Sequence, residues 1–151
     1  MKQQYGKAVT TSVEGPVAVV RFDRGVNRNA IDQDTLLALT EAVRDLSDEL
    51  DIQVVVFTGA KDIFSAGIDL KDPAKWNEDN ASLLHRRSIA QRGARLCQAL
   101  ENLPQITIAA IEGLAVGGSA ALALACDWRV ASNSSAIYLP EVKVGLNMGW
   151  G

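Results

Sequence analysis

The sequence predicts an α/β domain, in which strands and helices alternate along the chain. Short β-branched or apolar runs at residues 17–22, 54–58 and 106–111 are typical of buried strands. Between the first two runs, apolar residues recur at steps of three and four, as on one face of a helix: Leu36, Leu39, Val43, Leu46 and Leu50. With 48% hydrophobic and 22% charged residues, the 151-residue chain can bury one core, so we expect a single domain over residues 1–151.

The first half of the chain carries a local signal at the start of each element. Gly15 and Pro16 mark a turn before the strand at 17–22. A helix over about 33–49 would begin after Asp32, which is a favourable N-cap residue. The second strand is followed by a turn at 59–62.

The second half continues the alternation of helices and strands. A helix is expected from 84 to 103, because Pro104 ends it and apolar residues share one side of it: Ile89, Leu96, Leu100 and Leu103. A small-residue helix at 119–126 and short strands at 128–132 and 136–139 follow the third strand, and they lead to Glu141. The polar run at 77–80 is the expected mobile loop.

The most informative stretch runs from Glu112 to Asp127, where a strand end, Gly117-Gly118 and a small-residue helix follow one another. Glycines let the backbone turn without a Cβ, so peptide N–H groups can approach a ligand oxygen. The helix adds the positive end of its dipole at the same point. This pattern is typical of an oxyanion hole, although tight packing of a strand against a helix explains it equally well.

Three segments in order resemble motifs of the crotonase superfamily, the enoyl-CoA hydratases and isomerases. They read Phe-Ser-Ala-Gly-Ile-Asp-Leu at 64–70, Gly-Leu-Ala-Val-Gly-Gly at 113–118 and Pro-Glu-Val-Lys-Val-Gly at 140–145. The corresponding family patterns are F-x-A-G-x-D-L/I, G-x-A-x-G-G-G and P-E-x-x-x-G. The segment at 23–31 resembles a fourth element, with Gly25 in place of proline and Asp23 in place of asparagine. The resemblance runs from about Val17 to the last residue.

The resemblance implies a crotonase-like spiral of ββα units that lacks the usual C-terminal helices. In the family those helices close the spiral, complete the acyl pocket and help to form trimers. We therefore expect residues 1–151 to be a truncated core domain, and the complete protein to be a homotrimer or a dimer of trimers. The alternative is a naturally short member, which would expose the apolar faces meant for those helices.

The resemblance also implies a chemistry, in which an acyl-CoA thioester loses a proton next to its carbonyl. The backbone amides of Ile68 and Gly118 would hold the resulting enolate oxygen, and Glu141 would act as the base. The donor is a backbone amide, so the side chain at position 68 need not be of any particular type. The apolar side chain of Ile68 could at the same time simply fill space beneath a loop. Without the resemblance, Glu141 could be a solvent-facing glutamate at a strand end.

One position departs from the hydratase pattern. Hydratases of the family carry a second glutamate three residues after the donor glycine, and this chain has Ala121 there. Adding water uses two carboxylates, whereas moving a double bond needs one base, so we expect an isomerase. Alternatives remain: a hydratase or another lyase or hydrolase of the family, with Asp69, Asp72 or His85 supplying an acid, or a non-catalytic member that binds acyl-CoA or only assembles.

Coenzyme A, as part of the substrate, would need cations for its phosphates and an apolar slot for adenine. The candidate cations are Arg24, Arg28 and Lys71, with Arg28 first because its position in the family commonly carries Lys or Arg. The remaining candidate binding residues are Ala30, Ala66, Ile68, Asp69, Leu70 and Gly117. Surface cations without a ligand are the alternative, and Asp69 is expected mainly to support its own loop. No permanently bound cofactor is expected.

Composition limits the other function classes. The formal charge of −3 argues against general nucleic-acid binding. No apolar run approaches the ~20 residues of a membrane helix, and the first residues lack the apolar core of a signal peptide, so the cytoplasm is expected. Cys97 and Cys126 have neither metal-site nor disulfide spacing and are expected to be buried and inert, so no metal site is predicted.

Overall fold

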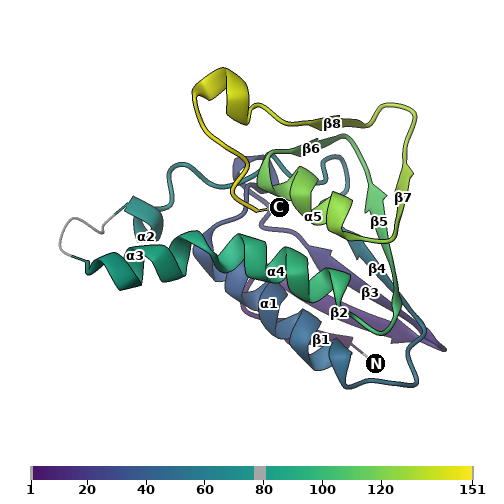
Figure 1. Cartoon of the computed structure of the whole chain (residues 1–151). Helices are drawn as coiled ribbons and strands as arrows, with labels where there is room; N and C mark the ends of the chain where they lie inside the picture. The colour runs from purple at the N-terminus through teal and green to yellow at the C-terminus, as the bar shows by residue number, and fades with distance from the viewer. Residues whose placement is uncertain (1, 77–80, 151) are drawn as a thin grey trace.

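The fold is a mixed sheet with helices packed over one face (Figure 1). The computed structural model describes residues 2–76 and 81–150, so the loop expected at 77–80 lies outside the described residues. The strands of the six-stranded sheet lie in the order β1 (Lys2–Tyr5), β2 (Val9–Glu14), β3 (Val17–Phe22), β4 (Val54–Thr58), β5 (Ile106–Ile111) and β7 (Trp128–Ala131).

Strand direction decides where the site lies. β1, β2 and β3 pair antiparallel through tight turns at Gly6 and Gly15, whose φ angles are 53° and 54°. β3, β4, β5 and β7 then run parallel, with Val20 opposite Phe57 and Phe57 opposite Ala109. The loops that follow β3, β4 and β5 consequently leave the sheet at one edge.

Helix α1 (Gln33–Ser47) forms where the sequence predicts it. The side chain of Asp32 accepts a hydrogen bond from Thr35 N at 2.8 Å and caps its first turn. The apolar side chains expected to face the core are buried, except that of Leu50, which is 78% exposed. The expectation for Leu50 was wrong because α1 ends at Ser47, so the chain has already left the helical path.

The single helix expected at 84–103 is divided into α3 (Leu83–Ala90) and α4 (Arg92–Glu101), which meet at Gln91. The break has a packing reason. α4 carries the buried face, with Leu96 and Leu100 in the core, whereas α3 has no buried residue. Gly93 is the weakest helix former in the stretch, and it lies two residues after Gln91. α1 and α4 lie side by side over the sheet (Figure 1).

A second, two-stranded sheet carries the glycine turn. β6 (Leu114–Val116) pairs in parallel with β8 (Ala136–Tyr138), and α5 (Gly118–Ala125) follows β6 directly. Short 3-10 turns η1 (Asn27–Asn29) and η2 (Glu141–Val144) and the short helix α2 (Pro73–Trp76) complete the described elements. The sequence analysis did not predict β1, β2, η1, η2 or α2, and it gave β6 only as a strand end before Gly117.

The core is one apolar cluster between the sheet and helices α1, α4 and α5. Phe22 and Phe64 meet edge to face within it, with ring centroids 5.2 Å apart. Both cysteines are buried as predicted, and burial raises the pKa of each thiol to about 12. Among the described helices, none has the length and apolar character needed to cross a bilayer.

The segments β7, β8 and η2 differ from this core because their apolar side chains are exposed. Every residue of β7 and β8 is exposed, including Trp128 at 66% and Val130 at 64%. Val142 in η2 is 84% exposed. These exposed side chains form an apolar surface on the outer side of β7, β8 and η2.

Candidate active site

The turn between β6 and α5 requires glycine at its first position. Gly117 has φ 54° and ψ −121°, a conformation that L side chains rarely adopt. Its amide donates to Tyr138 O at 2.8 Å, which ties the turn to β8. A Cβ on Gly117 would lie 2.8 Å from Oε1 of Glu141. The turn therefore brings the backbone at the start of α5 close to the Glu141 carboxylate.

The loop after β4 lies against the same turn. Ser65 N donates to Leu114 O at 2.9 Å, and Val116 N donates to Ser65 O at 3.1 Å. Gly67 has φ 90°, and a Cβ on it would lie 2.6 Å from Val116 O and 3.9 Å from Gly118 N. Close backbone contact thus holds the peptide that precedes Ile68 beside the first peptide of α5.

The pairing of this loop with Ile31 fixes the direction of the Ile68 amide. Ile31 N donates to Gly67 O at 2.7 Å, and Asp69 N donates to Ile31 O at 2.9 Å. In such a parallel bridge the polar groups of the middle residue, Ile68, point to the other side. Within residues 2–76 and 81–150, neither Ile68 N nor Gly118 N donates to an internal acceptor.

Both amides belong to residues that line one cavity of about 500 Å³. Its walls come from the loop at 66–70, the turn at 116–118 with Ala121, helices α1, α3 and α4, and residues 140–150. Glu141 also lines this cavity, and its Oε2 is buried without a hydrogen-bond partner among the described residues. A buried carboxylate oxygen without a donor is costly, so this atom marks a place where a ligand can bind or give up a proton.

Ala121 faces this cavity from α5. Glu141 is the sole acidic residue among those described as lining it. The other acids and the histidine considered from the sequence lie elsewhere. Asp69 forms an ion pair with Arg24. Asp72 accepts a hydrogen bond from Gln33 N at 2.8 Å, and His85 is exposed on α3.

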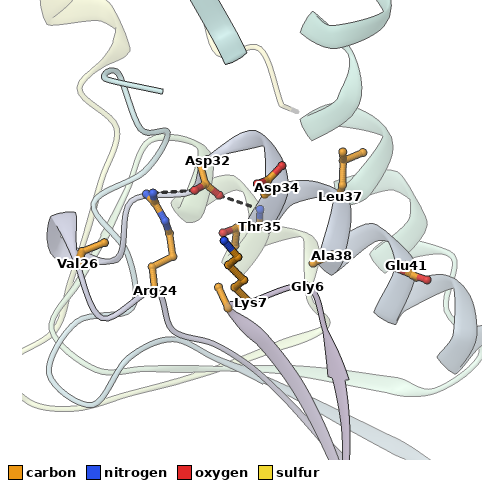
Figure 2. A pocket seen from close by; sticks show the side chains of 11 residues that line it. Gly6, Lys7, Arg24, Val26, Asp32, Asp34, Thr35, Leu37, Ala38 and Glu41 are labelled. Atoms are coloured by element: carbon orange, nitrogen blue, oxygen red, sulfur yellow. Dashed lines mark hydrogen bonds and ion pairs between the residues drawn. The ribbon is translucent and has the colours of Figure 1, made fainter. Parts of the chain in front are cut away.

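The guanidinium of Arg24 is held by ion pairs and a hydrogen bond within the protein. It pairs with Asp32 and with Asp69, each at 2.7 Å, and donates to Ala30 O at 2.6 Å. Figure 2 shows Arg24 reaching Asp32, which in turn caps α1 through Thr35. Two carboxylates neutralise this charge, so we leave Arg24 out of the proposed phosphate contacts.

Asp69 supports its loop, as expected of it, through several bonds. Its carboxylate accepts from Arg24, from Asn27 and from the amide of Lys71. The hydrogen bond from Arg24 is the largest cause that lowers the pKa of Asp69, while burial acts in the opposite direction. With its acceptors occupied in this way, Asp69 has a structural role beside the cavity.

Asn29 is a buried residue behind the candidate site that the sequence analysis did not single out. Its Nδ2 donates to Phe22 O at 3.0 Å and Phe64 O at 2.8 Å, and its Oδ1 accepts from Arg24 N at 3.1 Å. The side chain is buried and joins the ends of β3 and of the loop that carries Ile68. Its position in the segment resembling the fourth family element was the available signal.

The remaining candidate cations lie at the surface near that loop. Arg28 and Lys71 are exposed, and no hydrogen bond or ion pair engages either side chain within the described part of the chain. Arg28 O accepts from Ala66 N at 3.1 Å, so Arg28 lies next to the loop. Ala66, Ile68 and Leu70 line the cavity, whereas Ala30 is buried outside its lining.

The Asp69–Arg24 pair predicts a pH dependence of stability. A carboxyl group whose pKa is lowered by folding stabilises the folded state above its ordinary pKa of 3.8, and this contribution is lost as the pH falls through the lowered value. We expect urea unfolding to show a falling free energy of unfolding below about pH 4. Asp69→Asn should flatten that acid limb, whereas Asp48→Asn, at an exposed position, should leave it unchanged. An unchanged acid limb in Asp69→Asn would contradict this role.

Taken together, the structure is an α/β protein with a mixed sheet, a glycine turn and a cavity. Two of the backbone amides beside that cavity have no acceptor among the described residues. The particular family follows from comparison with known proteins. The chain belongs to the enoyl-CoA hydratase/isomerase family, whose sequence pattern matches residues 12–151. The resemblance to the crotonase superfamily and the predicted fold class are thereby confirmed.

Individual relatives give the same result. The chain is 36% identical over 139 residues to the fatty acid oxidation complex subunit alpha of Idiomarina loihiensis, covering 92% of this chain and 19% of that protein. It is 32% identical to the crotonyl-CoA hydratase of Syntrophomonas wolfei, covering 91% of this chain and 52% of the relative. The crystal structure of an enoyl-CoA hydratase from Bacillus anthracis superposes with a TM-score of 0.85 at 29% identity, over 96% of this chain and 55% of that one. The chain thus spans from about a fifth to about half of these relatives.

Proposed function

We propose that this protein isomerises an enoyl-CoA thioester with Glu141 as a single base. The observation that carries the proposal is the buried Oε2 of Glu141, which no described residue bonds, in the cavity that Ile68 and Gly118 also line. The thioester carbonyl would accept hydrogen bonds from the amides of Ile68 and Gly118. Each preorganised donor of this kind stabilises a developing oxyanion by roughly 3 kcal/mol.

The proposed reaction moves one proton within the substrate. Glu141 removes a proton from C2 of a 3-enoyl thioester, and the electron pair of that C–H bond delocalises onto the carbonyl oxygen and C4. The resulting dienolate takes the proton back from Glu141 at C4. The C3–C4 double bond becomes a C2–C3 double bond, and the base is restored.

Hydration is the second candidate, because relatives named as hydratases match most of the chain. Adding water across C2–C3 is served best by two carboxylates, one on each side of the water. Ala121 faces the cavity where the second carboxylate of that arrangement would stand, and Glu141 is the acid found among the described lining residues. This difference favours isomerisation.

Coenzyme A would lie outside the cavity mouth as part of the substrate. Arg28 and Lys71 are the proposed phosphate contacts because their cationic groups are exposed beside the loop at 66–70. The apolar side chains of Ile68 and Leu70, with Ala66, would contact the adenine or the pantetheine arm. Leu70, at 66% exposed, has the surface available for such a contact.

A paired assay tests this preference. We expect the protein to isomerise a 3-enoyl-CoA faster than it hydrates a 2-enoyl-CoA, since one base suffices for the first reaction. Ala121→Glu should raise the hydration rate relative to isomerisation, and Ala121→Gln, with the same bulk and no acid, should not. Ultraviolet absorbance of the conjugated thioester follows both reactions. Hydration at least as fast as isomerisation in the unaltered protein would contradict the proposal.

A further inference from the structure

Trp150 lines the cavity and packs against two glycines, Gly93 and Gly118. The indole is half-buried and contacts the core cluster. A Cβ on Gly118 would lie 3.1 Å from Cδ2 and Cε3 of the indole, so the ring lies beside the first residue of α5. A Cβ on Gly93 would overlap the same ring. The indole thus occupies a space that a side chain on Gly93 would block and that a side chain on Gly118 would crowd.

Trp150 also borders two hollows. It lines the cavity that Glu141, Gly118 and Ile68 line. The indole also borders a second hollow of about 440 Å³ along α4, lined by Gln91, Ala94, Arg95, Cys97, Gln98 and Glu101. Trp150 is the residue shared by the two linings as the structure describes them. Trp150 is therefore the point at which the cavity and the groove beside α4 meet the same side chain.

We propose that Trp150 is the end wall of the acyl site and restricts the substrate to short acyl chains. The inference rests on the proposed function, because a carbonyl held at the Gly118 amide places the first acyl carbons beside the Trp150 ring. A short chain would lie on the cavity side of the ring, where Ile89 of α3 also lines the cavity. A long chain would have to displace the indole from Gly93 to reach the groove along α4.

Binding of unreactive saturated thioesters tests the wall without requiring turnover. Isothermal titration calorimetry of the whole chain with butyryl-CoA, decanoyl-CoA and free coenzyme A compares a short chain, a long chain and no chain. In the unaltered protein we expect decanoyl-CoA to bind no more tightly than butyryl-CoA. Trp150→Ala joins the two hollows, so it should strengthen decanoyl-CoA binding by about tenfold or more through burial of added methylenes. Free coenzyme A should bind as before.

Two further variants keep the result interpretable. Trp150→Leu keeps an apolar side chain against the glycines and should shift chain-length preference in the same direction if Trp150→Ala does not fold, as judged by circular dichroism. Trp128→Ala removes an exposed tryptophan that borders neither hollow, and should leave the preference unchanged.

Several results would overturn the wall. One is an unaltered protein that binds decanoyl-CoA at least tenfold more tightly than butyryl-CoA, and another is a set of folded Trp150 variants with an unchanged preference. In both, binding of free coenzyme A would leave the proposed function standing. Failure of free coenzyme A and of both thioesters to bind would instead overturn the proposed function together with the wall.

Discussion

Replacing Glu141 by Gln should lower the rate of 3-enoyl-CoA isomerisation by about 10²- to 10⁴-fold. The amide keeps the shape of the side chain but cannot accept the C2 proton. The neighbouring residue, Gly117, lies against the carboxylate and has no side chain that could replace it as a base. Thioester binding should change much less than the rate, because the amides of Ile68 and Gly118 and the surface cations are retained.

A matched substitution separates loss of the base from loss of a negative charge. Glu14→Gln makes the same chemical change at an exposed position on β2 and should leave the rate within about twofold, as surface substitutions generally have small effects. If Glu141→Gln retained the full isomerisation rate, Glu141 would not be the base. An equal loss in Glu14→Gln would also contradict the assignment.

The second large effect is on stability. Asn29→Ala should lower the free energy of unfolding by about 2–4 kcal/mol, because it leaves two carbonyls and one amide without their partner. The loop that carries Ile68 loses its link to Phe22 at the end of β3. Urea unfolding measures the change.

Asn102→Ala provides the comparison for that loss. Its amide group donates a single exposed hydrogen bond, to Gln98 O at the end of α4. Removing it should cost less than about 0.5 kcal/mol. If the two variants lost similar stability, the buried network around Asn29 would not be the tie that holds the loop.

The spacing of apolar residues, together with turn and capping residues, predicted much of the fold. The strands at 17–22, 54–58 and 106–111 form with those bounds, and Asp32 caps α1. These signals succeed because they arise from local chemistry and from burial of one face. β1 and β2 were missed because most of their residues are polar and only partly alternate with apolar ones. Gln3, Gln4 and Ser12 are exposed, whereas Thr11 is a polar residue that is buried.

The site was predictable in part and for a different reason. Glycines and a motif glutamate can be read from the chain, and Gly117, Gly118 and Glu141 do lie around one cavity. The tertiary pairing of Arg24 with Asp32 and Asp69 could not be read, since it joins residues up to 45 positions apart. The position of Trp150 against Gly93 likewise depends on how the last residues fold back onto α4.

Exchange of the C2 protons of butyryl-CoA with deuterium oxide tests the central claim most directly. A saturated thioester cannot isomerise or hydrate, so C2 exchange, followed by proton NMR, reports proton removal next to a carbonyl held as an enolate. The account predicts exchange catalysed by the unaltered protein and reduced by about 10²-fold or more in Glu141→Gln. Equal exchange in the two proteins, or none above the buffer rate while butyryl-CoA is bound, would contradict it.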